Sequence, residues 1–139
     1  MILLDTNIVS EMMRPDPNSN VISWLNEQQT PQLFLSSITI AEVGYGLYVL
    51  PEGKRKQQLQ LRFEQFTKKA FSYRILDFTE QAAKNFARVM GDKHQAGRPM
   101  SVPDGQIAAI ALANGFALAT RNIKDFEDCG VELLNPFEG

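Results

Sequence analysis

The chain has 139 residues, a formal net charge of −2 and an apolar content of 44%, which fit one soluble domain, 1–139, and exclude a disordered chain. A single cysteine, Cys129, excludes a disulfide framework and fits a reducing compartment. No apolar run reaches the length of a membrane span and the N-terminus has no signal-peptide pattern, so we expect a cytoplasmic protein without a membrane partner.

Short apolar runs alternate with longer amphipathic segments along the chain. Such runs, closed by polar or glycine residues, are typical of buried strands, while apolar residues recurring every three or four positions indicate helices. In chain order, the expected strands are 2–4, 33–35, 73–76, 116–119 and 131–134. The expected helices are 8–13, 21–25, 39–50, 54–71, 79–94 and 103–113.

This alternation predicts an α/β domain in which helices flank a central, mainly parallel sheet of four to five strands. Ligands of such sheets bind outside the carboxyl ends of the strands. The residues that directly follow each strand are therefore the first candidates for chemistry.

Four acidic residues occupy such positions. Asp5 follows the first expected strand, and Glu42 lies near the start of the helix after the second. Asp104 lies near the start of the helix that leads into the fourth strand, and Asp125 comes five residues after Thr120, which closes that strand. If the first and fourth strands are neighbours, these acids converge at one edge of the sheet.

Converging carboxylates need a counter-charge. Two carboxylates 4 Å apart repel by about 4 kcal/mol at an effective dielectric constant of 20. A hard divalent cation removes this repulsion, and oxygen ligands favour Mg²⁺, with Mn²⁺ as a substitute. The chain has one histidine, His94, and no cysteine–histidine spacing, which excludes a typical zinc site.

Each acid also has a purely structural interpretation. Asp5 fits a helix N-cap, and Thr39-x-x-Glu42 matches a capping box. Asp104 would be a favourable charge in a first helical turn, and Asp125 would cap a turn. These roles compete with the metal site, or coexist with it.

Five segments in the same order make the sequence similar to one known family. They are 1–7 (MILLDTN), 37–46 (SITIAEVGYG), 103–109 (PDGQIAA), 118–126 (LATRNIKDF) and 134–137 (LNPF). The chain resembles the PIN-domain family, and within it the VapC and FitB-like toxins of bacterial type II toxin–antitoxin pairs. The resemblance implies a PIN-like three-layer sandwich.

The resemblance also implies a function. It implies a Mg²⁺-dependent endoribonuclease that cleaves cellular RNA and leaves 5′-phosphate ends. It implies inhibition by a cognate antitoxin that carries the complex to operator DNA, and a homodimer. Asp5, Glu42 and Asp104 match the family's metal-holding acids. Some relatives carry Asp where this chain has Asn122; we favour Asp125 as the fourth acid, with Asn122 beside it.

Other residues are expected to support this site. Thr6, Asn7 and Thr120 lie beside the acids in sequence and offer polar side chains. Arg98 and Arg121 are expected to contact the RNA backbone, because cations next to an acidic pocket attract phosphates.

The distribution of charge supports a nucleic-acid partner better than the total does. The segment 54–98 has a net charge of +7, whereas 1–53 has −5 and 99–139 has −4. A basic surface beside an acidic pocket is one interpretation of this asymmetry, and a solvated basic helix face is the other.

Two other functions compete with the nuclease. A haloacid-dehalogenase-like phosphatase also places Asp after its first strand, but its motif is Asp-x-Asp and this chain has Asn7 at the third position. A non-catalytic PIN-like binding module would use the same acids only as caps.

Overall fold

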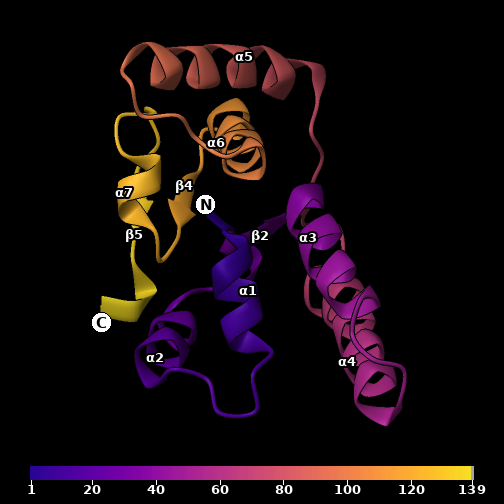
Figure 1. Cartoon of the computed structure of the whole chain (residues 1–139). Helices are drawn as coiled ribbons and strands as arrows, with labels where there is room; N and C mark the ends of the chain where they lie inside the picture. The colour runs from indigo at the N-terminus through magenta and orange to yellow at the C-terminus, as the bar shows by residue number, and fades with distance from the viewer. Residues whose placement is uncertain (139) are drawn as a thin grey trace.

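The computed structural model describes residues 1–138, and every expected strand and helix has a counterpart in it (Figure 1). The strands are β1 (Ile2–Leu4), β2 (Leu33–Ser36), β3 (Ile75–Leu76), β4 (Ala117–Ala119) and β5 (Leu133–Leu134). The α-helices are α1 (Thr6–Met12), α2 (Ser19–Glu27), α3 (Ser37–Tyr48), α4 (Lys54–Gln65), α5 (Glu80–Gln95), α6 (Val102–Asn114) and α7 (Ile123–Phe126). Short helical segments are η1 (Thr30–Gln32), the π-helical η2 (Phe66–Ala70) and η3 (Pro136–Glu138).

The five strands form one parallel sheet in the order β3-β2-β1-β4-β5. Ile2 of β1 pairs with Leu33 of β2 on one side and with Ala117 of β4 on the other. The predicted α/β class and sheet are confirmed, and β1 and β4 are neighbours, as convergence of the acids requires.

The third strand is shorter than expected, because the backbone at Tyr73 does not allow it to start there. Tyr73 has a φ of 63°, a left-handed conformation that no extended strand contains, and its side chain is fully exposed. The Arg74 guanidinium instead donates to the carbonyl oxygens of Thr30, at 2.6 Å, and Leu33, at 2.5 Å. The strand therefore begins at Ile75.

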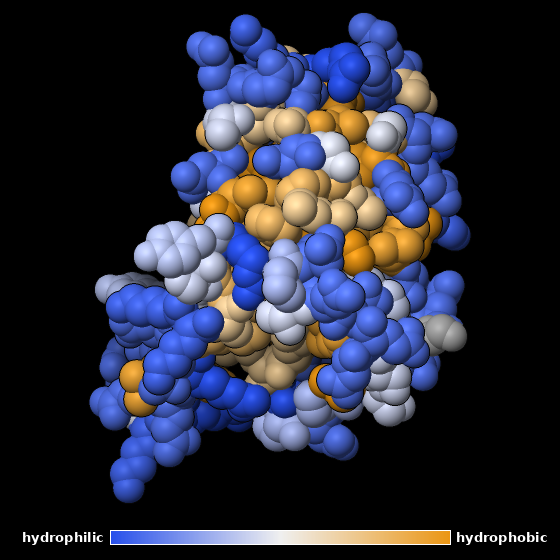
Figure 2. Space-filling view, turned by 180° about the vertical axis from the view of Figure 1, so that it is seen from behind, coloured by the Kyte–Doolittle hydropathy of each residue, from blue (hydrophilic) through white to orange (hydrophobic). Residues whose placement is uncertain are grey.

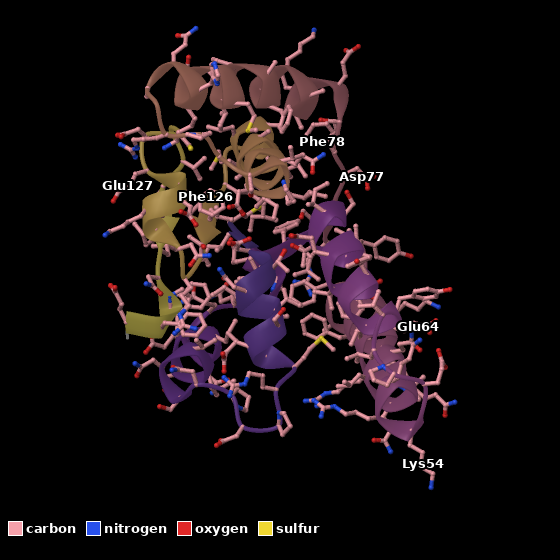
Figure 3. All side chains as sticks on the ribbon, in the orientation of Figure 1. Lys54, Glu64, Asp77, Phe78, Phe126 and Glu127 are labelled. Carbon is pink, nitrogen blue, oxygen red and sulfur yellow. The ribbon has the colours of Figure 1, made fainter. Side chains whose placement is uncertain are left out.

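Side chains that alternate along each strand divide the core into two layers. Leu3 and Leu118 face a cluster built by α5, α6 and α7, whereas their neighbours Leu4 and Ala119 face a cluster built by α1, α2 and α4. Phe126 of α7, labelled in Figure 3, is fully buried in the first cluster. The sheet thus lies between two helical layers, which is the three-layer sandwich that the sequence predicts.

A glycine at the start of α6 lets two helices approach closely. A Cβ atom on Gly105 would lie 2.5 Å from the Met90 sulfur of α5. The first turn of α6, which carries Asp104, is thereby fixed against α5.

Apolar residues are concentrated on one part of the surface. Seen from behind, apolar surface gathers in the upper half of the molecule between polar margins (Figure 2). On the other view, Lys54 and Glu64 project outward from α4 (Figure 3). Within residues 1–138, no helix combines the length and apolar character needed to cross a bilayer.

Candidate active site

The candidate site lies where the connections from β1 and β4 diverge. β1 is followed by Asp5 and β4 by Thr120, and the Asp5 amide donates to the Ala119 carbonyl at 2.9 Å. The chain leaves these two neighbouring strands toward opposite layers, which is the switch point at which open parallel sheets bind ligands.

Both carboxylate oxygens of Asp5 accept hydrogen bonds. Oδ1 accepts from the Thr6 amide at 2.8 Å, and Oδ2 accepts from the Thr120 hydroxyl at 2.7 Å. Asp5 is also the N-cap residue of α1, so the structural interpretation of this acid is confirmed alongside its place in the site. The side chain is 3% exposed, and its rotamer is fixed by these contacts.

Asn7 joins the two connections. Its amide nitrogen donates to Asp5 Oδ2 at 3.3 Å, and its amide oxygen accepts from the Arg121 backbone at 3.3 Å. The Thr120 hydroxyl also accepts from the Asn122 amide at 3.0 Å. The structure therefore brings Asn7, Thr120 and Asn122 together around Asp5.

Glu42 reaches the same place from α3. The Thr6 hydroxyl donates to Glu42 Oε1 at 2.7 Å. The capping-box interpretation of Thr39 and Glu42 is wrong, because the N-cap of α3 is Ser36, whose hydroxyl accepts from the Thr39 amide at 3.1 Å. Glu42 is thus free of a capping role.

Asp104 lies between two hollows in the surface. One, of about 510 Å³, is lined by Asp5, Glu42, Asp104 and Asn122. The other, of about 290 Å³, is lined by Asp104 and Asp125. Asp104 therefore shares one hollow with Asp5, Glu42 and Asn122 and the other with Asp125.

The pKa values of Asp5 and Asp104 respond to burial and to the charges of the other acids. Burial raises the pKa of Asp5 to about 6; the Thr120 and Thr6 hydrogen bonds oppose the rise, and the Asp104 and Glu42 charges add to it. Burial also raises the pKa of Asp104, with further increases from the charges of Asp125 and Glu42. Among residues 1–138, no ion pair links any of the four acids to a basic side chain.

These residues fit a divalent cation by the chemistry of their donors. They offer only carboxylate, hydroxyl and amide oxygens, which suit a hard ion such as Mg²⁺ or Mn²⁺. In the part of the chain that the structure describes, no three acidic, histidine or cysteine side chains already enclose a metal position. Water or substrate oxygens would complete the coordination, as is usual for Mg²⁺.

The two expected RNA-binding arginines lie in different hollows. Arg121 lines the hollow of Asp5, and its guanidinium stacks 4.6 Å from the Phe137 ring centroid. Arg98 lines the hollow of Asp125 and lies 3.5 Å from an Asp128 carboxylate oxygen. Arg98 and Arg121 are both exposed, and each lines a hollow that Asp104 also lines.

The model of the PIN domain matches residues 2–131. This chain belongs to the PIN-domain family.

Individual relatives match the PIN domain over nearly its whole length. It is 39% identical to the VapC ribonuclease Y4jK of Sinorhizobium fredii, with 99% of both chains covered, and 39% identical to the toxin FitB of Neisseria gonorrhoeae, with the same coverage. The solved structure of FitAB bound to an IR36 DNA fragment superposes with a TM-score of 0.92 at 39% identity, covering 99% of this chain and 96% of that one.

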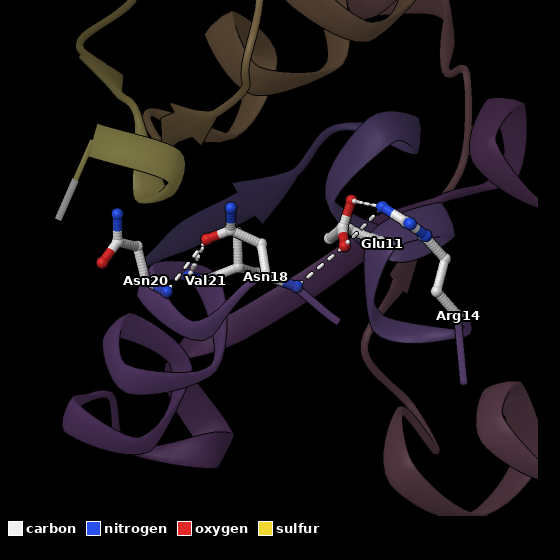
Figure 4. Close-up of polar contacts among 5 residues, drawn as sticks. All are labelled: Glu11, Arg14, Asn18, Asn20 and Val21. Atoms are coloured by element: carbon white, nitrogen blue, oxygen red, sulfur yellow. Dashed lines mark hydrogen bonds and ion pairs between the residues drawn. The ribbon is translucent and has the colours of Figure 1, made fainter. Parts of the chain in front are cut away.

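The candidate site of the PIN domain contains two more charged residues, which the sequence analysis did not single out. Glu11 and Arg14 line the hollow of Asp5. Glu11 is 6% exposed; its carboxylate accepts from the Arg14 guanidinium at 3.2 Å and from the Asn18 amide at 2.8 Å (Figure 4). Their i, i+3 spacing, from the last turn of α1 to just past its C-cap, was the available signal.

The raised pKa of Asp5 gives a first testable prediction. Asp5→Asn is expected to raise the Tm of the metal-free PIN domain at pH 7.5 by several degrees. The shift from 3.8 to about 6 corresponds to about 3 kcal/mol against the charged form. Between pH 4 and 6 the folded protein keeps a proton that the unfolded chain releases, so this stability is lost as pH rises.

Melting curves in EDTA at several pH values measure this effect. The difference in Tm between variant and wild type should shrink as the pH falls toward 4 and disappear below the unfolded pKa of 3.8, where both states bind the proton. A variant that is equally or less stable at pH 7.5 would contradict the burial argument.

Proposed function

We propose that this PIN domain, 1–139 as a single unit, is a metal-dependent endoribonuclease and the toxin of a type II toxin–antitoxin pair. The observation that supports it most is the convergence of Asp5, Glu42 and Asp104, from three separate parts of the chain, on one hollow, while no ion pair within residues 1–138 links them to a basic side chain. The ribonuclease and toxin names of the relatives agree with this chemistry.

We infer that the cation is Mg²⁺, with Mn²⁺ as a substitute. Asp5, Glu42 and Asp104 would hold it, with Asp125 as the favoured fourth acid and Asn122 as the neighbouring polar group. When bound, it would lower the pKa of a water molecule and neutralise charge on the scissile phosphate. Burial is the main cause of the raised pKa values of Asp5 and Asp104, and repulsion among the acids adds to it; a bound cation would offset both effects.

The chain's own residues account for the remaining steps. Thr120 and Thr6 orient Asp5 through both of its oxygens. A carboxylate of the site accepts the proton of the attacking water, and Arg121 and Arg98 attract the phosphates of the strand. The family resemblance implies that the 3′-oxygen is the leaving group, so that hydrolysis leaves a 5′-phosphate and a 3′-hydroxyl.

We further propose a cognate antitoxin, with which the protein binds operator DNA, and a homodimer. The FitAB complex bound to DNA supports the first inference. Exposed Tyr45, Tyr48 and Val49 on α3 offer apolar surface for a second copy or a partner. The absence of a helix that spans a bilayer within residues 1–138 agrees with a cytoplasmic site of action.

The phosphatase alternative finds no support in the site. The Asn7 amide donates to Asp5, so it cannot serve as the second acid of that chemistry. The non-catalytic module is the alternative that an experiment must exclude.

Incubation of the purified protein with RNA tests the function. We expect fragments with 5′-phosphate and 3′-hydroxyl ends, which is the polarity that the resemblance to the PIN-domain family implies. End-specific ligation and phosphatase treatment identify the ends. Cyclic 2′,3′-phosphates would indicate attack by the RNA's own 2′-hydroxyl, and intact RNA would favour the binding module; either result contradicts the proposal.

A further inference from the structure

A line of three buried or half-buried hydroxyls ends on Glu42. The Ser36 hydroxyl lies 3.4 Å from the Thr39 hydroxyl. The Thr39 hydroxyl lies 2.9 Å from the Thr6 hydroxyl, and the Thr6 hydroxyl lies 2.7 Å from Glu42 Oε1. Ser36 and Thr39 are both fully buried. The line connects the end of β2 with α3 and α1.

The direction of every bond in this line is fixed by counting hydrogens. A carboxylate has none to donate, so the Thr6 hydroxyl gives its single hydrogen to Glu42. Thr39 must then donate to Thr6, and Ser36 to Thr39. All three dipoles therefore point toward the carboxylate, and each bond polarises the next.

This arrangement restricts the long Glu42 side chain. Ordering a glutamate costs side-chain rotamer entropy, which a cation would otherwise have to offset on binding. Oε1 is held by Thr6, and within residues 1–138 no hydrogen bond occupies Oε2. Glu42 lines the hollow with Asp5 and Asp104, so the unoccupied oxygen is the one available to a cation.

We propose that Thr39 is a positioning residue: its hydroxyl, through Thr6, orients Glu42 for the divalent cation. This inference rests on the proposed function. It assigns a role in metal affinity to a residue that contacts neither metal nor RNA. Partners of metal ligands typically change metal affinity 10–100-fold when removed.

Metal binding without RNA tests the proposal. Mg²⁺ affinity is measured by calorimetry or by the Mg²⁺-dependent rise in Tm. We expect Thr39→Val to weaken Mg²⁺ binding by about 10-fold, while Thr39→Ser keeps near wild-type affinity because it retains the hydroxyl. If valine lowers the metal-free Tm, Thr39→Ala removes the same hydroxyl without adding bulk.

A double-mutant cycle separates positioning from general damage. In a Glu42→Gln background, Thr39→Val should cause no further loss of Mg²⁺ affinity, because the line then has no carboxylate to orient. An additional loss of the same size in that background, or unchanged affinity of Thr39→Val alone, overturns the proposal. Wild-type protein that binds no Mg²⁺ and cleaves no RNA overturns the proposed function itself.

Discussion

Asp104→Asn is expected to reduce RNA cleavage by about 1,000-fold or more, because in the proposed site it removes a charge that would hold the cation and support a developing transition state. Asp104 lines both hollows of the site, and its pKa is raised by the charges of Asp125 and Glu42, so it stands at the centre of the acids. Asn has nearly the same size as Asp, and the Ser101 cap contacts the backbone of residue 104, so the fold should remain intact.

The matched control is Glu132→Gln. Glu132 is an exposed acid at the opposite edge of the sheet, just before β5, and its loss changes the net charge by the same amount. It should cleave RNA at the wild-type rate. Normal cleavage by Asp104→Asn, with an unchanged melting curve, would remove this residue from the proposed site.

Removal of divalent metal is the second change with a large expected effect. EDTA should stop RNA cleavage, because without the metal the acids have no compensating charge. Added Mg²⁺ or Mn²⁺ should restore cleavage. The Tm should rise with Mg²⁺ concentration by mass action, because the ion binds the folded protein. Asp104→Asn should show little of this rise.

Zinc and calcium serve as controls for the type of ion. Ca²⁺ prefers more ligands at longer distances, and Zn²⁺ prefers nitrogen or sulfur donors, so neither should restore full activity. Cleavage that persists in EDTA would show a metal-independent mechanism and would contradict the assignment of the acids.

The position of the acids was predictable because the sheet dictates it. Apolar runs marked β1 and β4, and neighbouring parallel strands bring Asp5 and Thr120 to the same edge. Asp104 and Asp125 follow because their helices adjoin β4 in sequence. The sequence alone does not decide whether Asp125 or Asn122 is the fourth metal-site residue. In the structure the two lie in different hollows, and Asp104 lines both.

Contacts between distant elements were not predictable in the same way. The Thr39-x-x-Glu42 spacing matches a capping box, but the cap is Ser36, and Glu42 bonds instead to Thr6, 36 residues away in sequence. The Glu11–Arg14 pair beside the acids has an i, i+3 spacing that is common on helix surfaces, so the spacing alone does not reveal its place in the hollow. Local spacing cannot show which side of α1 faces α3.

The charge count of the middle segment overstates the basic surface available to RNA. Lys56 is 7% exposed and pairs with Glu52 at 2.6 Å, and Lys93 is 6% exposed and donates to the Glu127 carbonyl. Among the basic residues of segment 54–98, Arg98 alone is exposed and lines the hollow of Asp104 and Asp125. The position of each charge therefore matters more than the sum.

Crystals of the protein soaked in MnCl₂ test the central claim most directly. An anomalous difference map locates Mn²⁺ without reference to activity. We predict a peak in the hollow between Asp5 and Asp104, within coordination distance of their carboxylate oxygens, which are ligands that suit Mn²⁺. An active protein whose anomalous peaks all lie away from Asp5, Glu42 and Asp104 would contradict the account.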